Sequence, residues 1–265
     1  MTRYAAMFER LRARDEGAFG AFLMLGDLDH ATSAKLLAAA AAGGADMIEV
    51  GIPYSDPVAD GPVIQRAAQR ALGAGARVDD AFALIRDFRA GHADIPVGIL
   101  TYANILAARG RDRFCADAAA AGADSILVAD VPSLEAPAIS AAARAAGLHL
   151  VMIAAPNTPR AVLDRIALLS SGYTYCVARS GVTGTSDALA LDHDALFAGL
   201  AEAGAPPPVL GFGISTPAQV RQALGAGAAG VIAGSAIVRL IEEAADPATA
   251  IRDFVAGMKA ATARA

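Results

Sequence analysis

Short apolar segments alternate with helix-like segments along the whole chain of 265 residues. Each apolar segment is bounded by glycine, proline or polar turn residues, a pattern typical of buried parallel strands. We expect about eight strands, which cover 21–27, 45–53, 96–102, 124–132, 149–156, 173–180, 208–213 and 230–234. Eight strand–helix units suit a closed barrel of about 250 residues, whereas an open doubly wound sheet needs fewer. The pattern therefore predicts an α/β fold, a (β/α)8 TIM barrel.

The segments between the strands are amphipathic, and helices are predicted over 79–90, 111–121, 159–170 and 217–226. At the last of these, Ser215-Thr216-Pro217 provides a capping hydroxyl and a proline at the first helical position. We also expect an extra helix at the N-terminus and extra helices in the loops that follow strands. No linker or low-complexity stretch divides the chain, so residues 1–265 are predicted to form a single domain.

Composition narrows the class of protein. Hydrophobic residues make up 55% of the chain, enough for one large core, but no apolar run reaches the roughly 18–20 residues that span a bilayer. A start without a secretion signal predicts a cytoplasmic protein. The net charge of −5 argues against broad nucleic-acid binding. Cys115, Cys176 and the four histidines show no metal-ligand spacing, so no metal site is predicted.

Glu49 interrupts the apolar run 45–52, which reads as a buried strand. Burying an unpaired carboxylate costs several kcal/mol, which favours a functional role. Alternation along the strand places Met47, Glu49 and Gly51 on one face and the aliphatic residues 48, 50 and 52 on the other. Because the aliphatic face must pack against helices, Glu49 is predicted to point into the barrel. It lies near the C-terminal end of its strand, which is the end where the active site of such a barrel lies. The structural alternative is a buried ion pair with an arginine.

A second acid, Asp60, lies in the loop that follows this strand. Two carboxylates at one strand end indicate acid–base chemistry. Asp56 and Asp130 are alternative candidates for the second acid, and spacing alone does not choose among them.

Small residues at the last two strand ends indicate a phosphate site. Gly211-Phe212-Gly213 ends the seventh strand, and Gly234-Ser235 ends the eighth just before a helix. Backbone N–H groups and a helix N-terminus can hold an anion there, as in other barrels of this type, although Gly-x-Gly alone also fits a tight turn. The long polar loop 179–187 is a candidate lid. Tyr175, on the strand before it, can face either the site or plain core.

The assembled motifs resemble those of the tryptophan synthase α subunit family, essentially from end to end. The resemblance is carried by 49–62 (EVGIPYSDPVADGP), 102–104 (YAN), 127–132 (LVADVP), 179–184 (RSGVTG), 211–214 (GFGI) and 234–238 (GSAIV). The first motif is long and specific, and all of them occur in the family's order. The resemblance implies retro-aldol cleavage of indole-3-glycerol phosphate to indole and glyceraldehyde 3-phosphate, in tryptophan biosynthesis.

The resemblance also assigns roles. It makes Glu49 the acid–base group, favours Asp60 as the acceptor of the indole N–H, and makes Tyr175 the residue that positions Glu49 or substrate. The expected substrate-binding residues are Phe22, Leu100, Leu127, Ala129, Ile153, Thr183 and Phe212. The apolar residues among them could equally well serve only to pack the core of the barrel. The expected phosphate-binding residues are Gly184, Gly213, Gly234 and Ser235.

By the same resemblance, the chain needs no metal or cofactor of its own and works in an α2β2 complex, whose β subunit carries pyridoxal phosphate. The positions expected at that interface are Asp56, Pro57, Asn104 and Pro132. Three departures from the family's usual residues are Tyr54 for phenylalanine, Thr101 for methionine and Leu28 for proline.

Three other functions stay open at this stage. The chain could be a stand-alone lyase that uses the same residues without a β subunit. It could be an isomerase or epimerase of a sugar phosphate, or a regulatory subunit that binds ligand without turnover. The pair of acids weighs against the last two.

Overall fold

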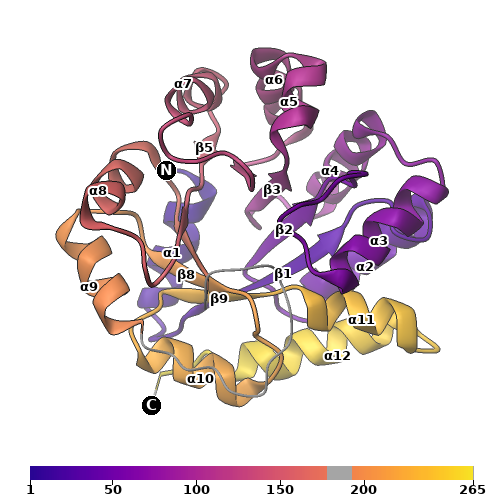
Figure 1. Cartoon of the computed structure of the whole chain (residues 1–265). Coiled ribbons are helices and arrows are strands. Elements are labelled where there is room, and N and C mark those ends of the chain that lie inside the picture. Colours follow the sequence, from indigo (N-terminus) through magenta and orange to yellow (C-terminus); the bar gives the residue numbers. More distant parts are fainter. Residues whose placement is uncertain (178–192, 265) are drawn as a thin grey trace.

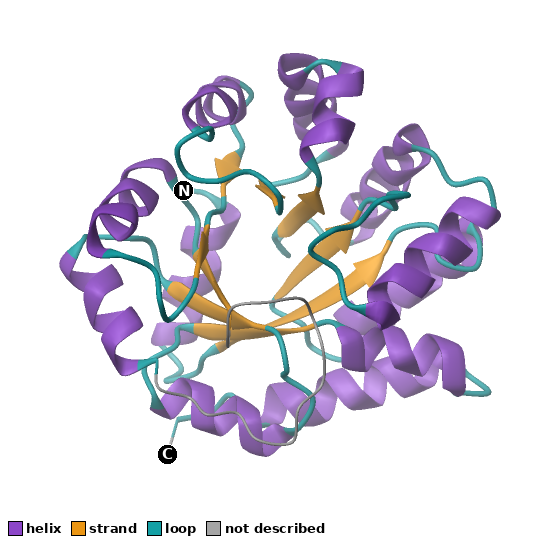
Figure 2. Cartoon of the chain, viewed as in Figure 1, coloured by secondary structure: helices purple, strands orange, loops and turns teal. Residues whose placement is uncertain are grey.

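The computed structural model describes residues 1–177 and 193–264. In these ranges the strands form one sheet in the middle of the molecule, and helices surround it (Figures 1 and 2). The strands are β1 (Ala18–Met24), β2 (Met47–Gly51), β3 (Val97–Thr101), β4 (Ser125–Val128), β5 (His149–Leu150), β6 (Ile153–Ala154), β7 (Thr174–Val177), β8 (Pro208–Gly211) and β9 (Gly230–Ala233). The helices are α1 (Arg3–Arg12), α2 (His30–Ala42), α3 (Pro62–Gly73), α4 (Val78–Gly91), α5 (Ala103–Arg109), α6 (Arg111–Ala121), α7 (Pro137–Ala145), α8 (Arg160–Leu169), α9 (Asp194–Glu202), α10 (Pro217–Gly225), α11 (Ser235–Glu243) and α12 (Pro247–Ala260).

Every strand pairing is parallel, in the order β5-β4-β3-β2-β1-β9-β8-β7-β6. The two ends of this order, β5 and β6, are consecutive pieces of the fifth predicted strand. Val151 N donates to Ile126 O at 2.9 Å, and Tyr175 N donates to Met152 O at 3.0 Å. One chain segment therefore bonds to both ends of the sheet, which closes it into a barrel and confirms the predicted fold class.

Each of the eight predicted strands overlaps an observed strand, and the range 149–156 overlaps two, but the limits differ. β1 begins at Ala18 and ends at Met24, so the predicted range 21–27 lies three residues too far along the chain. Gly26, with φ 77°, and Leu28, with φ 69°, turn the chain after Leu25. The predicted helix 111–121 is observed unchanged as α6, and Thr216 caps α10 as expected.

Extra helices appear where they were predicted. α1 precedes the first strand, and β2, β3 and β9 are each followed by two helices. Tyr4 of α1 is buried, its hydroxyl lies 2.8 Å from Ser125 Oγ, and its ring packs against Tyr173. α1 therefore covers one end of the barrel interior and leaves the carboxyl ends of the strands for the site. In the described part of the chain, no helix is long and apolar enough to cross a bilayer.

The side chains of β2 follow the predicted alternation. Ile48, Val50 and Ile52 belong to the outer hydrophobic layer between sheet and helices, while Met47 belongs to the layer inside the barrel. This confirms that the face of β2 that carries Glu49 points inward.

Candidate active site

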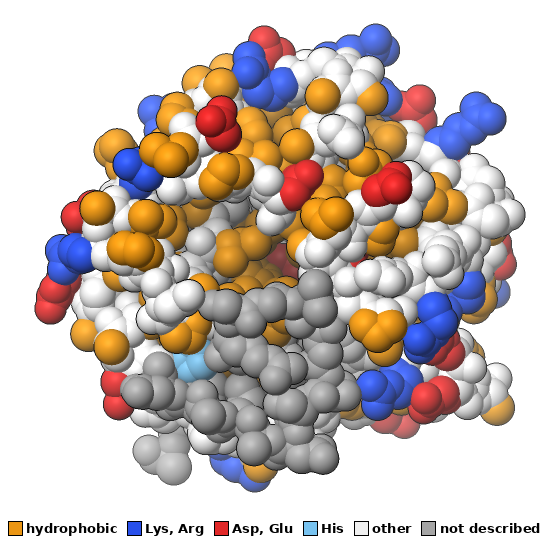
Figure 3. Space-filling model, in the orientation of Figure 1, with side chains coloured by type: hydrophobic (Ala, Val, Ile, Leu, Met, Phe, Trp, Pro, Cys, Tyr) orange, Lys and Arg blue, Asp and Glu red, His pale blue; other side chains and the backbone are white. Residues whose placement is uncertain are grey.

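A cavity of roughly 750 Å³, its open mouth included, lies at the carboxyl ends of the strands. Figure 3 shows hydrophobic side chains lining a hollow in this face of the molecule. The cavity brings together every predicted catalytic, ring-binding and phosphate-binding residue within the described ranges: Phe22, Glu49, Asp60, Leu100, Leu127, Ala129, Ile153, Tyr175, Phe212, Gly213, Gly234 and Ser235. Thr183 and Gly184 lie outside the described residues.

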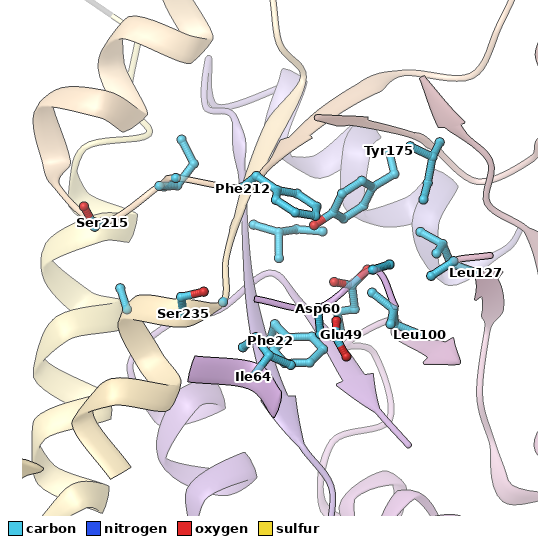
Figure 4. A pocket seen from close by; sticks show the side chains of 18 residues that line it. Phe22, Glu49, Asp60, Ile64, Leu100, Leu127, Tyr175, Phe212, Ser215 and Ser235 are labelled. Carbon is cyan, nitrogen blue, oxygen red and sulfur yellow. The ribbon is translucent and has the colours of Figure 1, made fainter. Parts of the chain in front are cut away.

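Glu49 projects from β2 into the apolar part of this cavity (Figure 4). Its side chain is 3% exposed, and Tyr173 Oη donates a hydrogen bond to Glu49 Oε1 at 3.1 Å. Burial raises the pKa of Glu49 to about 8, because a charged carboxylate loses its hydration there; the Tyr173 hydrogen bond offsets part of this increase, and nearby Asp60 adds to it. Among the described residues no arginine forms an ion pair with Glu49 or shifts its pKa, so these residues do not support the alternative of a buried bridge. Glu49 is thus able to hold or release a proton near neutral pH.

Asp60 lies on the loop between β2 and α3, on the same side of the cavity as Glu49 (Figure 4). Its side chain is 7% exposed, and burial raises its pKa to about 6. The nearby Tyr102 hydroxyl offsets part of that increase in the pKa of Asp60. The geometry between the two groups falls short of a regular hydrogen bond, and the Tyr102 hydroxyl has no other hydrogen-bond partner among the described residues. Gln65 Nε2 donates to Asp60 O at 2.7 Å and ties the loop to the first turn of α3. Above pH 6 the cavity therefore contains a carboxylate at a fixed position.

Tyr175 and Phe212 form the opposite wall (Figure 4). Their rings meet edge to face, with centroids 6.0 Å apart. A Cβ atom on Gly211 would lie 2.0 Å from Tyr175 Oη, so glycine makes room for this ring. Phe212 has φ 75°, a conformation that costs free energy for a residue with a side chain and that is found mainly where function requires it. This turn directs the Phe212 ring into the cavity.

The far end of the cavity is suited to an anion. Gly234 and Ser235 begin α11, whose N-terminus has no side-chain cap. By contrast, α10 is closed by Thr216 and Gln219 in a capping box. The first N–H groups of α11 are left without a side-chain cap and carry positive partial charge, the arrangement that binds phosphate at helix ends. The site therefore has an apolar middle, two acids at one side and an anion cradle at the other.

Comparison with known proteins decides the family. The family model for the tryptophan synthase alpha chain matches residues 8–263. The chain belongs to the tryptophan synthase alpha chain family. It is 48% identical to the tryptophan synthase alpha chain of Aeromonas salmonicida, over 100% of both chains, and 46% identical to that of Shewanella amazonensis, over 99% of this chain and 100% of that one.

Solved structures agree with this assignment. The tryptophan synthase subunit alpha of Legionella pneumophila has a TM-score of 0.88 at 33% identity and covers 99% of this chain and 98% of its own. A chain from the structure of Mycobacterium tuberculosis tryptophan synthase has a TM-score of 0.90 at 31% identity, over 100% of this chain and 99% of its own. The TIM-barrel fold is thus shared over the full length.

Of the residues that the alpha chain family led us to expect at a partner interface, Asp56, Pro57 and Pro132 lie on loops and Asn104 lies in the first turn of α5. Asp56, Asn104 and Pro132 are exposed, and Pro57 is half-buried. Next to them, Val58 is 71% exposed and Leu134 is 70% exposed. Large apolar side chains left in solvent beside these loops fit a docking surface for another protein.

The three departures from the family's usual residues have different structural settings. The extra hydroxyl of Tyr54 accepts a hydrogen bond from Asn104 Nδ2 at 2.8 Å. Leu28 has φ 69°, which the ring of proline cannot adopt, so this turn excludes the proline common in the family. The Thr101 hydroxyl is buried without a hydrogen-bond partner among the described residues, and nothing in the structure explains it.

Sequence reasoning missed Tyr173 and six residues that line the cavity, which are Ala59, Ile64, Ile214, Ser215, Ile232 and Ala236. Tyr173, not Tyr175, forms the hydrogen bond to Glu49 in this structure. The sequence indicates that Tyr173 and Tyr175 share one face of their strand. It does not indicate which of the two hydroxyls reaches Glu49, because that depends on the stagger between β7 and β2. Ser215 also lines the cavity, one residue before the Thr216 cap. The sequence Ser215-Thr216-Pro217 predicts the start of a helix and carries no signal for a residue that lines a cavity.

Replacing Gly211 with alanine is expected to lower kcat/KM for the family's substrate by about tenfold or more, because the new methyl group would displace the Tyr175 ring. Steady-state kinetics checks this. The control is Gly257→Ala in α12, where a Cβ meets no atom within 4 Å. That substitution should leave kinetics unchanged and stabilise the fold by up to about 1 kcal/mol. Equal kinetics for both variants would contradict the role given to Gly211.

Proposed function

We propose that this chain cleaves indole-3-glycerol phosphate to indole and glyceraldehyde 3-phosphate in tryptophan biosynthesis. Family membership supports the reaction. The observation that carries the proposal is the pairing of two buried carboxyls of raised pKa with an uncapped helix N-terminus across one apolar cavity. A flat aromatic ring joined to a phosphate by a short chain matches all three features.

Glu49 is the proposed acid–base group. Cleavage needs a proton at indole C3, which makes C3 tetrahedral and places positive charge on the ring nitrogen. It also needs a base that takes the proton from the side-chain hydroxyl next to the ring. The C3–carbon bond then breaks, its electrons restore the aromatic ring, and the former alcohol leaves as an aldehyde. A carboxyl with pKa about 8 is suited both to give and to take a proton at neutral pH.

Asp60 is the proposed partner of the indole N–H. Positive charge at that nitrogen grows as C3 is protonated, so a fixed carboxylate stabilises the transition state more than the bound substrate. Tyr175 and Phe212 would hold the ring from the other wall, together with Phe22, Leu100, Leu127, Ala129 and Ile153. Gly213, Gly234 and Ser235 would hold the phosphate, and Thr183 and Gly184 keep the roles expected from the sequence.

We assign no metal or cofactor to this chain, because two carboxyls can carry every proton transfer in the reaction. The proposed partner is a tryptophan synthase β subunit, in an α2β2 complex where pyridoxal phosphate belongs to β. A related solved structure, the tryptophan synthase complex from Pyrococcus furiosus, supports such an assembly. Asp56, Pro57, Asn104 and Pro132 would face the partner. We further propose that residues 1–265 act as one cytoplasmic domain.

Product analysis tests the reaction. The purified chain, incubated with indole-3-glycerol phosphate, should release indole and glyceraldehyde 3-phosphate in equal amounts. Isomerised or epimerised substrate without free indole would show a different reaction and overturn the proposal.

Replacing Tyr173 with phenylalanine should move the rising limb of the pH profile of kcat/KM to higher pH. The Tyr173 hydroxyl donates to Glu49 and favours its ionised form, so its loss raises the pKa of Glu49 further. Hydrogen bonds to charged groups contribute about 1.5–3 kcal/mol, so the shift should be about one to two pH units. Tyr54→Phe, which removes a hydroxyl from an outer loop, should leave the limb in place. An unmoved limb in Tyr173→Phe would contradict this role.

A further inference from the structure

A network of ion pairs joins α3 to α11 outside the cavity. Glu242, near the end of α11, accepts hydrogen bonds from Arg66 Nε at 3.0 Å and Arg66 Nη2 at 2.8 Å, and it also contacts Arg70 Nη1. Arg66 and Arg70 are four residues apart on one face of α3. Figure 1 shows α3 and α11 side by side, and the two helices are in contact.

Arg70 is itself fixed from the other side. Its Nε and Nη2 each lie 2.7 Å from an oxygen of Asp27, which is fully buried in the loop after β1. This two-pronged geometry holds the guanidinium in one orientation. Hydrogen bonds from Arg66 and Arg70 lower the pKa of Glu242 to about 2, so Glu242 stays ionised at any pH at which the protein would be assayed.

The two joined helices carry opposite ends of the site. Asp60 lies two residues before α3 begins and is tied to it through Gln65. Ser235 is the first residue of α11, about 10 Å along the helix from Glu242 at 1.5 Å per residue. The network therefore connects the support of the acid at the ring end with the support of the anion cradle.

We propose that Glu242 is a positioning residue that sets the spacing between Asp60 and the phosphate cradle. This inference rests on the proposed function, since it assumes a substrate that spans both ends. Glu242 touches no substrate. It acts by holding two binding elements at the separation that one molecule requires, so the ring and the phosphate are bound together without further rearrangement.

The test compares an intact ligand with its two halves in Glu242→Gln. This variant removes the charge of Glu242 and one of its two acceptor oxygens, which weakens the link between α3 and α11 and leaves the Arg70–Asp27 pair in place. The probes are indole, glycerol 3-phosphate and a non-cleavable analogue, in which a plain three-carbon chain joins the indole ring to phosphate. Calorimetry should show about a tenfold loss of affinity for the analogue, and less than about twofold for either half, because only the intact ligand depends on the spacing.

The matched control is Glu202→Gln, which removes the charge of Glu202 from the Arg160–Glu202 pair between α8 and α9. It should change none of the three affinities. Unchanged affinity for the analogue in Glu242→Gln would overturn the inference, as would an equal loss for the analogue and both halves, which would mark a merely structural role. These measurements need no turnover, so failure of wild-type cleavage would count against the proposed function alone.

Discussion

Glu49→Gln is expected to lower kcat for indole-3-glycerol phosphate cleavage by about a thousandfold or more, with little change in KM. Glutamine keeps the size of the side chain and an oxygen that can accept from Tyr173, but it can neither give nor take the proton. Stopped and steady-state assays of indole release check this. Near-normal turnover would remove Glu49 from the mechanism.

Stability measurements on the same variant separate chemistry from folding. Glu49 has a pKa of about 8 in the folded chain against 4.5 for an ordinary glutamate. The folded state thus keeps a proton that the unfolded state releases between pH 4.5 and 8, and the wild type loses stability as pH rises through that window. Glutamine carries no such penalty. We expect Glu49→Gln to gain stability relative to wild type from pH 5 to pH 9, by an amount on the order of 4 kcal/mol. A pH-independent difference would contradict the raised pKa.

Asp60→Asn should lower kcat by about a hundredfold while KM changes much less. Asparagine can still accept a hydrogen bond from the indole N–H, but it lacks the charge that stabilises the developing positive nitrogen. Steady-state kinetics again gives both parameters.

Two further variants serve as controls for Asp60. Asp56 is exposed on the same loop, and Asp130 accepts a hydrogen bond from Ala103 N at 2.8 Å outside the cavity lining. Their asparagine variants should keep the wild-type kcat of the isolated chain. A higher KM at unchanged kcat in Asp60→Asn would show that the carboxylate binds substrate and transition state equally. An Asp130→Asn variant that lost as much kcat would move the role to that residue.

Local patterns in the sequence were sufficient to predict the barrel and the inward direction of the Glu49 side chain. Alternation along β2 depends only on strand geometry and on the need to bury Ile48, Val50 and Ile52 against helices. The same logic predicted that Gly213 and Gly234 lie close together, and both line the cavity, because loops at the carboxyl ends of parallel strands meet at one face.

Features that depend on packing between elements distant in the sequence could not be predicted from the sequence. The Tyr173–Glu49 hydrogen bond joins residues 124 positions apart, and its length depends on the stagger across the barrel. The positive φ of Phe212 has no signature in that residue's type, since most residues with a side chain avoid it. The ion pair between Arg66 of α3 and Glu242 of α11 joins residues 176 positions apart, and it requires that the two helices lie side by side. The sequence of an exposed helix face does not indicate which distant residue will pair with its charged side chains.

Indole release from indole-3-glycerol phosphate, measured for the purified chain alone and after addition of a tryptophan synthase β subunit, tests the account most directly. We expect slow release by the chain alone and a strong increase with β, and both activities should be lost in Glu49→Gln. Fast release that β leaves unchanged would contradict the proposed partnership and make the chain an independent lyase. No release in either condition, from folded protein, would contradict the proposed chemistry itself.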